Sequence, residues 1–425
     1  MRFLHKDAQR TARSQASAFR RLWGGTAASN LADGVIIAAA PLLAASLTRD
    51  PLLVSGIVVA QQLPWVVFTL FAGFIVDRAD RRKLLVGANV MRALALGLLV
   101  VCLVTSTENI ALLYLVLFGL GLAETIIDNA ALAVLPGILD RELLERANGR
   151  IFATQSVLNE LVGPPLGGAL FAVSAVLTFA SGSVAFAVAA AVLALLPRSK
   201  GKPHPPSTAL PGMWGSIAEG LQWFWANKLI RTVAIMAGVV NLFGAATLGV
   251  LVLVATSDFG LDAGGYGLLL TGGAVGGIIA GLVADRLIQR FGSGVVIVMS
   301  NLLPAIGYLV LALTYSAVIA GLALALVSFA GTVGNVVVVT LRQASVPDHL
   351  LGRVASAYRL VALGALPLGG ILGGLIATAF GLRAPFYLGA GCLAVLAVVL
   401  APILTTKAID RATGKTGQRD RRTNG

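Results

Sequence analysis

Charged residues are scarce in this sequence, and acidic residues are the scarcer kind. Charged residues make up 12% of its 425 residues, with 19 Asp and Glu against 32 Lys and Arg, while hydrophobic residues make up 57%. Soluble globular domains carry roughly twice that share of charge, so the composition excludes an ordinary soluble protein. We therefore interpret the net charge of +13 as information on membrane topology and not as a nucleic-acid binding surface.

Residues for disulfide, metal or phosphate chemistry are also few. Cys102 and Cys392 both fall in apolar stretches, where a free thiol packs as a small hydrophobe. His5, His204 and His349 lie outside those stretches and have no metal-ligand partners. No Gly-x-x-x-x-Gly-Lys-(Ser/Thr) segment is present, so ATP is not expected as an energy source. We expect no metal, no cofactor and no enzymatic reaction.

Long apolar stretches run along the whole chain. Each has about 20 residues, which as a helix crosses roughly 30 Å of hydrocarbon. The stretches are continuous and not alternating, and this favours helices over the strands of a membrane β-barrel. The predicted spans are Trp23–Ser46, Leu52–Val76, Leu84–Val104, Ile110–Val134, Ile151–Val173, Leu177–Leu196, Val233–Ala255, Tyr266–Ala284, Val295–Leu313, Val318–Val339, Ser356–Phe380 and Pro385–Leu404. The sequence predicts an all-α integral membrane protein with twelve transmembrane helices.

The basic residues indicate how the chain is oriented. With alternate connections on opposite sides, 29 of the 32 Lys and Arg fall on the side of the N-terminus, Arg49 and Arg383 fall on the other, and Arg92 lies within a span. By the positive-inside rule both termini are predicted to be cytoplasmic. The predicted parts are a cytoplasmic tail (1–22), a six-helix bundle (23–196), a cytoplasmic linker with an interfacial helix (197–232), a second six-helix bundle (233–405) and a second cytoplasmic tail (406–425).

Two short segments recur at nearly one spacing. Gly73-Phe-Ile-Val-Asp77-Arg78 returns 208 residues later as Gly281-Leu-Val-Ala-Asp285-Arg286. Leu143-Leu144-Glu145-Arg146 returns 207 residues later as Leu350-Leu351-Gly352-Arg353. Parallel halves of this kind occur in one large class of secondary transporter, with the binding site near the midplane between the halves.

The first of these segments resembles the signature of the major facilitator superfamily. That signature lies between helices 2 and 3 and has the form Gly-x-x-x-Asp-(Arg/Lys)-x-Gly-Arg-(Arg/Lys)-(Arg/Lys). The matching residues are Gly73, Asp77, Arg78, Arg81, Arg82 and Lys83. Asp80 stands where the family usually has Gly. The resemblance covers about residues 20 to 405 and implies two pseudo-symmetric six-helix bundles.

The resemblance also implies a gating latch. Asp77 opposes the dipole of its own helix and needs a partner, which in the family is the start of helix 11, near 355–359 here. By the repeat, Asp285 would face the start of helix 5 near Arg150. The predicted latch residues are Gly73, Asp77, Arg78, Arg81, Arg82, Gly281, Asp285 and Arg286. The alternative is that the basic residues only set topology and contact lipid phosphates.

Two further segments resemble exporters. Gly163-Pro164-Pro165-Leu166-Gly167-Gly168 is similar to the Gly-Pro-x-x-Gly-Gly pattern of the antiporter branch. Asn30-Leu-Ala-Asp33-Gly34 resembles the drug and siderophore exporters grouped with enterobactin exporters and macrolide-efflux proteins. Gly163, Gly167 and Gly168 allow close helix approach and Pro164 removes a donor to Glu160, which suggests a role where the two bundles meet. Packing alone is the alternative.

Charges inside the predicted spans are the candidates for energy coupling. Those that lie away from the ends of their spans are Asp33, Arg92, Glu124, Asp128 and Glu160. Each costs about 2.5 to 3.5 kcal/mol at a helix centre, so each must face protein, water or another charge. By helical rise, Asp33 and Glu124 lie about 16 Å deep, Arg92 about 13 Å and Asp128 about 10 Å. We expect an ion pair between Arg92 and Asp128, with Glu124 as the other acid within reach.

Helices 1 and 4 line the central cavity in the family, so carboxyl groups there are the expected coupling site. A partly desolvated carboxyl group lets a proton compete with a cationic or polar substrate. Asp33 is the first candidate, Glu124 the second and Glu160 the third, while a static salt bridge is the alternative for Asp33 and Glu124. Asn30, Asn241 and Asn335 are the expected polar groups of the cavity. The spans of the second half contain no carboxylate, so that half is expected to offer apolar surface to the substrate.

These features together predict a proton-coupled exporter of amphipathic small molecules such as drugs, antibiotics or siderophores. The expected partners are that substrate, protons and the lipid bilayer of the cytoplasmic membrane, with a monomer as the working unit. An importer or lipid flippase on the same scaffold is the alternative within transport. A non-transporting membrane receptor or scaffold is the alternative outside it.

Overall fold

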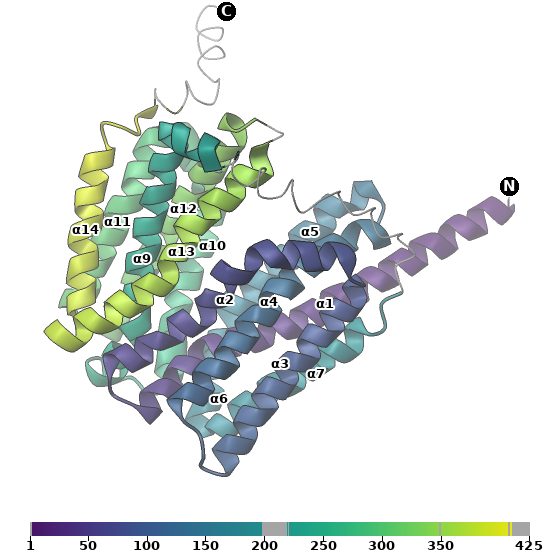
Figure 1. Ribbon diagram of the computed structural model, residues 1–425, viewed down its shortest axis with the longest axis horizontal. Helices are drawn as coiled ribbons and strands as arrows, with labels where there is room; N and C mark the ends of the chain where they lie inside the picture. The colour runs from purple at the N-terminus through teal and green to yellow at the C-terminus, as the bar shows by residue number, and fades with distance from the viewer. Residues whose placement is uncertain (1, 198–218, 220, 348–349, 407–408, 410–425) are drawn as a thin grey trace, which may run out of the picture. The chain divides into compact units, whose positions relative to one another are not determined.

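The apolar stretches form helices because a backbone in hydrocarbon must satisfy its hydrogen bonds within itself. The computed structural model describes residues 2–197, 219, 221–347, 350–406 and 409, and the side chains of 2–12, 14, 69–78, 132, 141 and 352 lie outside that description. Within the described residues, eleven helices are long and apolar enough to span a membrane, and α14 is a shorter apolar helix of 17 residues. No strand occurs among them. The prediction of an all-α protein with twelve apolar helices is confirmed (Figure 1).

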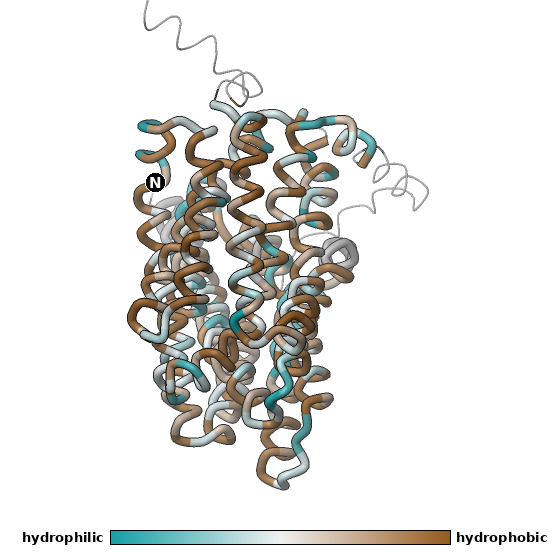
Figure 2. The backbone as a smooth tube through the Cα atoms, turned by 90° about the vertical axis from the view of Figure 1, so that its left-hand side faces the viewer, coloured by the Kyte–Doolittle hydropathy of each residue, from teal (hydrophilic) through white to brown (hydrophobic). Residues whose placement is uncertain are grey.

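The helices of the first half follow one another with short connections. They are α1 (Arg2–Leu47), α2 (Pro51–Arg78), α3 (Arg81–Val104), α4 (Ile110–Ile138), α5 (Arg141–Gln155), η1 (Ser156–Val162), α6 (Gly163–Val173) and α7 (Ala175–Leu193). Because α5, η1 and α6 run on without a break, they form a single candidate span, Glu142–Val173. Apolar residues dominate the helices when the backbone is coloured by hydropathy (Figure 2).

The second half repeats this pattern. Its helices are α9 (Lys228–Ser257), α10 (Ala263–Phe291), α11 (Ser293–Leu313), α12 (Ala317–Ser345), α13 (Leu351–Phe380) and α14 (Ala384–Leu400). Polar residues fix where several helices begin, because their side chains accept hydrogen bonds from free backbone N–H groups. Asn109 accepts from Leu112 N at 2.9 Å before α4, and Asn227 accepts from Ile230 N at 3.1 Å before α9.

By packing, the chain divides into two compact units. Unit 1 comprises Met1–Thr48, Ala60–Thr208 and Asp262–Leu268, and unit 2 comprises Arg49–Val59, Ala209–Leu261 and Leu269–Gly425. Each half of the chain therefore contributes one short segment to the other unit: the first turns of α2 belong to unit 2, and the first turns of α10 belong to unit 1. The two predicted bundles did not anticipate this exchange, because hydropathy records only which residues are apolar.

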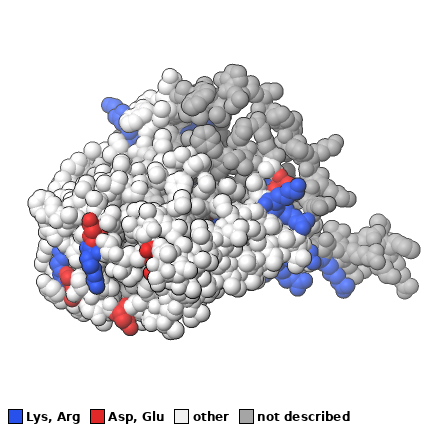
Figure 3. All heavy atoms as spheres, turned by 60° about the horizontal axis from the view of Figure 1, so that its bottom comes forward, with Lys and Arg blue, Asp and Glu red and all other residues white. Residues whose placement is uncertain are grey.

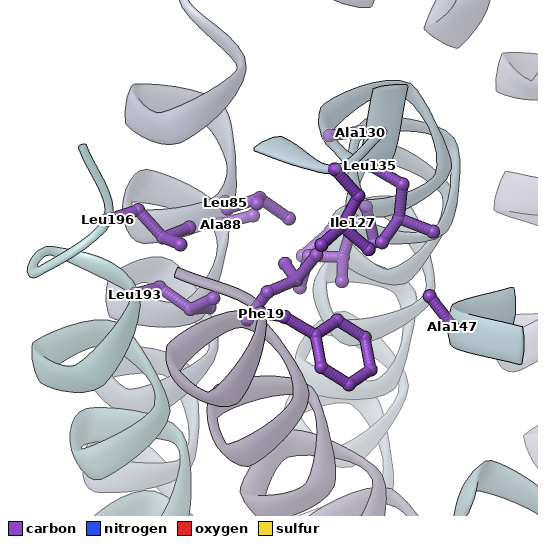
Figure 4. Close-up of a cluster of buried hydrophobic side chains, with 13 residues drawn as sticks. Phe19, Leu85, Ala88, Ile127, Ala130, Leu135, Ala147, Leu193 and Leu196 are labelled. Carbon is purple, nitrogen blue, oxygen red and sulfur yellow. The ribbon is translucent and has the colours of Figure 1, made fainter. Parts of the chain in front are cut away.

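A hydrophobic cluster joins five helices of unit 1 around Phe19 (Figure 4). Phe19 and Leu22 of α1 are buried there, although the sequence-based boundary places both in the N-terminal tail. The other members come from α3, α4, α5 and the end of α7, with Leu85, Ile127 and Ala147 among them. Charged side chains cover only small areas of the face shown in Figure 3, as the scarcity of charge requires.

The predicted interfacial helix is only partly described. Met213, Trp214 and Ile217 lie outside the described residues, as do most of the residues of the second tail. Residues 221–226 are helical, and Phe224 is fully buried against Val354 and other residues at the start of α13. The end of the linker therefore packs against α13 within unit 2.

Candidate functional site

A buried ion pair lies at the centre of unit 1. The Arg92 guanidinium, on α3, donates to the Asp33 carboxylate on α1, and it also donates to Ser29 Oγ at 3.0 Å. Its Cζ lies 4.3 Å from the centroid of the Phe186 ring on α7, a cation–π arrangement. The Arg92 side chain is 1% exposed and the Asp33 side chain 12% exposed. Partners on two other helices, α1 and α7, thereby hold Arg92 in a place where an unpaired charge would be costly.

A cavity of about 340 Å³ opens beside this ion pair. It lies wholly within unit 1 and is lined by residues of α1, α3, α4 and α5. The lining residues are Thr26, Ser29, Asn30, Asp33, Arg92, Glu124, Ile127, Asp128, Ala131, Asn148, Ile151, Phe152 and Gln155. Most small-molecule sites are largely apolar with a few convergent polar groups, so this cavity is unusual for its density of charge.

Three carboxyl groups and one guanidinium line this cavity. Glu124 and Asp128 are one turn apart on α4 and half-buried, so both can reach the space that Asp33 and Arg92 border. A site with this excess of acid favours protons or cations over anions. The structure thus brings together the first two predicted coupling residues, the predicted ion-pair residues and Asn30.

The predicted partner of Arg92 needs a correction. The sequence-based depths favoured Asp128, but the ion pair that forms joins Arg92 to Asp33. The depths gave the position of each residue along the bilayer normal. They did not give the direction in which its side chain points from the helix. Asp128 instead borders the cavity. Among the described residues, its carboxyl group forms no ion pair.

The glycines of the Gly-Pro-x-x-Gly-Gly segment pack directly against α1 next to Asp33. A Cβ added at Gly163 would lie 2.5 Å from the carbonyl carbon of Gly34, and one at Gly167 would lie 3.0 Å from the Cα of Val35. Because no side chain fits in these positions, α1 and α6 approach closely at the residue that follows Asp33. This segment therefore fixes the backbone of the candidate coupling residue.

The third glycine of the segment faces a different helix. A Cβ at Gly168 would lie 3.0 Å from the Cα of Gly267, in the part of α10 that belongs to unit 1. Pro164 is buried, and its carbonyl lies under Gly267. The predicted role of these residues where the bundles meet stays a prediction, whereas the close approach to α1 and to the start of α10 is a feature of unit 1.

A π-helical turn, which the sequence analysis missed, precedes this segment. In η1 the N–H of Gly163 donates to Leu158 O, five residues back, and Pro164 has no N–H to restore the α-helical pattern. Such a turn adds one residue, which rotates the side chains on its two sides by about 100° relative to each other. It also places the carbonyl of Leu158 2.5 Å from the position of a Cβ on Gly34. In the sequence, Pro164 directly after Gly163 is the feature that could have indicated an irregular helical turn here.

Glu160 lies in η1 and outside the cavity. Its side chain is exposed on the surface of unit 1, and the neighbouring Asn159 has a buried Oδ1 without a hydrogen-bond partner. An exposed carboxylate within a candidate span is costly unless it meets water or another polar group. The structure therefore separates this third candidate from Asp33 and Glu124.

Arg81 and Arg82 bind backbone carbonyls in or near the last turns of two helices of unit 1. Arg81 donates to Ala133 O of α4 at 2.6 Å, and Arg82 donates to Ala194 O at the end of α7. Guanidinium groups stabilise such carbonyl groups because a helix C-terminus carries partial negative charge. Asp80, which departs from the family pattern, caps α3 by accepting from Arg82 N at 3.0 Å. These residues fasten three helices together, a role that neither sequence interpretation included.

The rest of the predicted latch is only partly visible. The side chains of Gly73, Asp77 and Arg78 lie outside the described residues. In unit 2 the side chains of Asp285 and Arg286 are exposed on α10. A Cβ at Gly281 would meet no atom within 4 Å.

The polar residues of the second half are less concentrated. Asn241 of α9 donates to Ala362 O of α13 at 2.7 Å, and Asn335 of α12 is exposed. In unit 1, Asn30 donates to Thr26 O at 2.8 Å within α1 while it borders the cavity.

Eight cavity residues are absent from the predicted set: Thr26, Ser29, Ile127, Ala131, Asn148, Ile151, Phe152 and Gln155. Ser29 could have been found, since it lies one turn before Asp33 on the same helical face.

A second copy of part of the glycine segment also escaped notice. Pro165-Leu166-Gly167-Gly168 returns as Pro367-Leu368-Gly369-Gly370 in α13. A Cβ at Gly369 would lie 2.9 Å from the carbonyl carbon of Leu242, and one at Gly370 would lie 3.2 Å from Ser55 O in α2. The first glycine of each pair thus faces the first helix of its own half, and the second faces the short segment exchanged between halves.

Comparison with known proteins identifies the family. The transmembrane secretion effector family matches residues 10–416 of the chain. The chain belongs to this family, which is part of the major facilitator superfamily. The resemblance inferred from the loop and helix motifs is therefore confirmed. Because this family and the relatives below are membrane transporters, the chain is a multi-pass membrane transporter and not an enzyme.

Two relatives cover most of the chain. The multidrug efflux pump Tap of Mycolicibacterium fortuitum is 29% identical over 374 residues, which are 83% of this chain and 88% of Tap. The enterobactin exporter EntS of Shigella boydii serotype 4 is 25% identical over 362 residues, which are 83% of this chain and 85% of EntS.

Solved structures show the same fold. A bacterial homologue of the human lysosomal transporter Spinster, in an inward-facing and occupied conformation, has a TM-score of 0.72 at 15% identity and covers 93% of this chain and 98% of its own. The nucleoside transporter NupG has a TM-score of 0.72 at 12% identity, with 92% and 98% covered. At these identities the likeness concerns the fold alone.

Proposed function

We propose that this transporter exports amphipathic small molecules in exchange for protons and that the cavity of unit 1 is its coupling site. The observation that carries this proposal is the juxtaposition of Asp33, paired with Arg92, and two further carboxyl groups in one cavity. A static structural pair needs one acid for one base. Two additional acids at the same place supply groups that can exchange protons or contact a cation.

Movement of a proton to Asp33 is the central step. Protonation removes the negative charge that holds Arg92, because a neutral carboxyl group binds a guanidinium less strongly than a carboxylate does. Glu124 and Asp128 border the same cavity, so Arg92 can turn to one of them instead of remaining unpaired. A lipophilic cation would compete with the proton for the same acids, which links occupation by one to release of the other.

The direction and class of substrate rest on the relatives. Tap is a multidrug efflux pump and EntS an enterobactin exporter, so both move compounds outward. The excess of acid in the cavity favours cationic amphipathic drugs for this chain. We further propose insertion in the bacterial inner membrane with both termini cytoplasmic, on the strength of the distribution of Lys and Arg.

Gating by Asp77 and Arg78 is part of the same proposal. The match to the family signature supports a charged latch that closes the cytoplasmic face, with Gly73, Gly281, Asp285 and Arg286 as its remaining elements. Arg81 and Arg82 are assigned instead to fastening α3, α4 and α7, because their guanidinium groups bind backbone carbonyls of those helices.

Transport in proteoliposomes tests the function. Vesicles loaded with ethidium and given an inwardly directed proton gradient should lose dye through the wild-type protein, and collapsing the gradient should stop the loss. Asp33→Asn should reduce this gradient-driven loss by at least about tenfold, which corresponds to a barrier higher by about 1.4 kcal/mol.

The matched control is Asp140→Asn, the same chemical change at an exposed residue whose side chain forms no cap hydrogen bond. If Asp33→Asn and the wild type showed equal efflux, the ion pair between Asp33 and Arg92 would be a static salt bridge without a role in coupling. Dye uptake driven by the gradient would support an importer, and movement of labelled lipid instead of dye would support a flippase. No movement by wild-type protein across a broad set of compounds would favour a receptor.

A further inference from the structure

Unit 2 contains an apolar groove with Arg290 close to one of its lining residues, Phe291. Its volume is about 360 Å³, and its walls come from α10, α11 and α12. The lining residues are Leu287, Phe291, Val295, Val296, Met299, Ser300, Leu303, Phe329, Ala330 and Val333. Ser300 is the one polar residue among them, and its hydroxyl is already bonded to Ile297 O at 2.8 Å. The groove therefore offers a ligand contact with hydrocarbon and no free polar group.

The groove runs lengthwise along α11. Its lining residues on that helix extend from Val295, near the helix start, to Leu303, a rise of about 12 Å. Phe291, Val295 and Met299 are exposed large hydrophobic residues, so one side of the groove is open to the surroundings of the helices. A long, narrow and open apolar space parallel to a spanning helix matches an extended alkyl chain better than a compact drug molecule.

The turn between α10 and α11 forms the polar end of the groove. Only Gly292 separates the two helices, and its φ of 82° is a conformation that residues with a side chain rarely adopt. This tight turn brings Phe291 and Val295 to the mouth of the groove. The guanidinium carbon of Arg290 lies 5.7 Å from the centroid of the Phe291 ring, so a positive charge lies beside a residue that lines the groove.

We propose that this groove binds an anionic phospholipid, with one acyl chain between α10, α11 and α12 and the phosphate at Arg290. The positive charge lies at the helix ends and the apolar space extends from there along the helices. A bound phospholipid would place its headgroup and its acyl chain in the same order. In the proposed orientation this is the cytoplasmic leaflet. The site lies outside the acidic cavity of unit 1, so the assignment does not depend on the proposed coupling mechanism.

Lipid binding to the purified protein tests the proposal directly. The protein, stripped of native lipid, is titrated with dioleoylphosphatidylglycerol or dioleoylphosphatidylcholine, and bound lipid is counted by native mass spectrometry. The wild type should bind the anionic lipid more tightly than the zwitterionic one. Arg290→Gln should weaken phosphatidylglycerol binding about fivefold, since one basic residue near a lipid surface contributes about that factor.

Two further variants separate this site from general charge effects. Arg146→Gln removes an exposed basic residue from α5 of unit 1 and should leave lipid binding as in the wild type. Val295→Phe fills the groove from a half-exposed position without enlarging the buried core, and should weaken binding of both lipids. Equal affinity for the two lipids, or full binding in Val295→Phe, would overturn the assignment, as would displacement of the lipid by ethidium.

Discussion

Equivalent positions of the two halves carry charged side chains in the first half and uncharged polar side chains in the second. At the repeat spacing of 208 residues, Asp33 and Arg92 of the first half correspond to Asn241 and Ser300 of the second. The first pair is a buried ion pair on a charged cavity, whereas Asn241 bonds a backbone carbonyl of α13 and Ser300 bonds its own helix. Duplication thus preserved where polar groups lie but not their charge. Two helical bundles can share one architecture because helix packing depends on shape. In the proposed mechanism only the first bundle uses ionisable groups to couple transport to protons.

The packing around these positions was conserved more closely than the charges. In both halves a Pro-Leu-Gly-Gly segment places its first glycine against the first helix of that half, at Val35 and at Leu242. These contacts lie one to two residues beyond the aligned Asp33 and Asn241. Close helix approach is therefore common to both halves, whereas the carboxylate at Asp33 is replaced by the amide of Asn241.

Breaking the ion pair should have the largest effect on stability. Arg92→Met leaves the buried Asp33 carboxylate without its partner, and removal of one member of a buried pair costs about 3 to 5 kcal/mol. The double variant Asp33→Asn, Arg92→Met should recover most of this loss, because neither charge then remains buried. The unfolding free energy in mixed micelles measures both.

An exposed ion pair of unit 2 provides the matched comparison. Arg353 donates to Glu219, and both side chains are well exposed. Arg353→Met should therefore cost at most about 1 kcal/mol. If the losses for Arg92→Met and Asp33→Asn simply added in the double variant, the two residues would not be acting as a coupled pair.

Filling the glycine contacts should have the next largest effect, in both halves. A Cβ at Gly167 would press on Val35, and one at Gly369 on Leu242, so each change to Ala should cost about 1 to 3 kcal/mol as in other overpacked sites. Gly119→Ala of α4 is the control, because a Cβ there meets nothing within 4 Å. Thermal unfolding in detergent measures all three.

The two glycine variants should differ in transport. Gly167→Ala moves the backbone beside Asp33 and should alter the dependence of efflux on the proton gradient, whereas Gly369→Ala should lower efflux without changing that dependence. Identical effects of both variants on the gradient dependence would mean that the glycines act only through packing.

Removing the neutral counterpart of Asp33 should have the smallest effect. Asn241→Ala leaves Ala362 O without its side-chain donor, which should lower the unfolding free energy by about 1 kcal/mol. Because no proton is exchanged at Asn241, efflux should keep the gradient dependence of the wild type. A changed gradient dependence in this variant would show that the second half also takes part in coupling.

The sequence predicted the helices well and the rotation of their side chains poorly. Twelve apolar stretches could be recognised because bilayer thickness sets a minimum helix length, and residues such as Asp33 and Glu124 stood out because charge in hydrocarbon is costly. Depth along a helix does not give its rotation, so Arg92 was assigned to Asp128 when the chain pairs it with Asp33. The π-helical turn at Ser156–Val162 changes the rotation of that span further, and no hydropathy pattern records such a turn.

Connections between helices were harder still to predict. Arg81 and Arg82 match a family signature, which suggested a latch or lipid contacts, but their guanidinium groups bind carbonyls of α4 and of the residue after α7. Their targets lie 52 and 112 residues away in the sequence, and backbone carbonyls carry no residue-specific signal.

Proton release on substrate binding tests the central claim most directly. Purified protein in weakly buffered detergent solution, near neutral pH, is mixed with tetraphenylphosphonium while a pH-sensitive dye reports free protons. The account predicts that the wild type and Asp140→Asn acidify the solution as they bind the cation, and that Asp33→Asn binds it with a much smaller proton release. Equal proton release from Asp33→Asn and the wild type would contradict the assignment of coupling to Asp33.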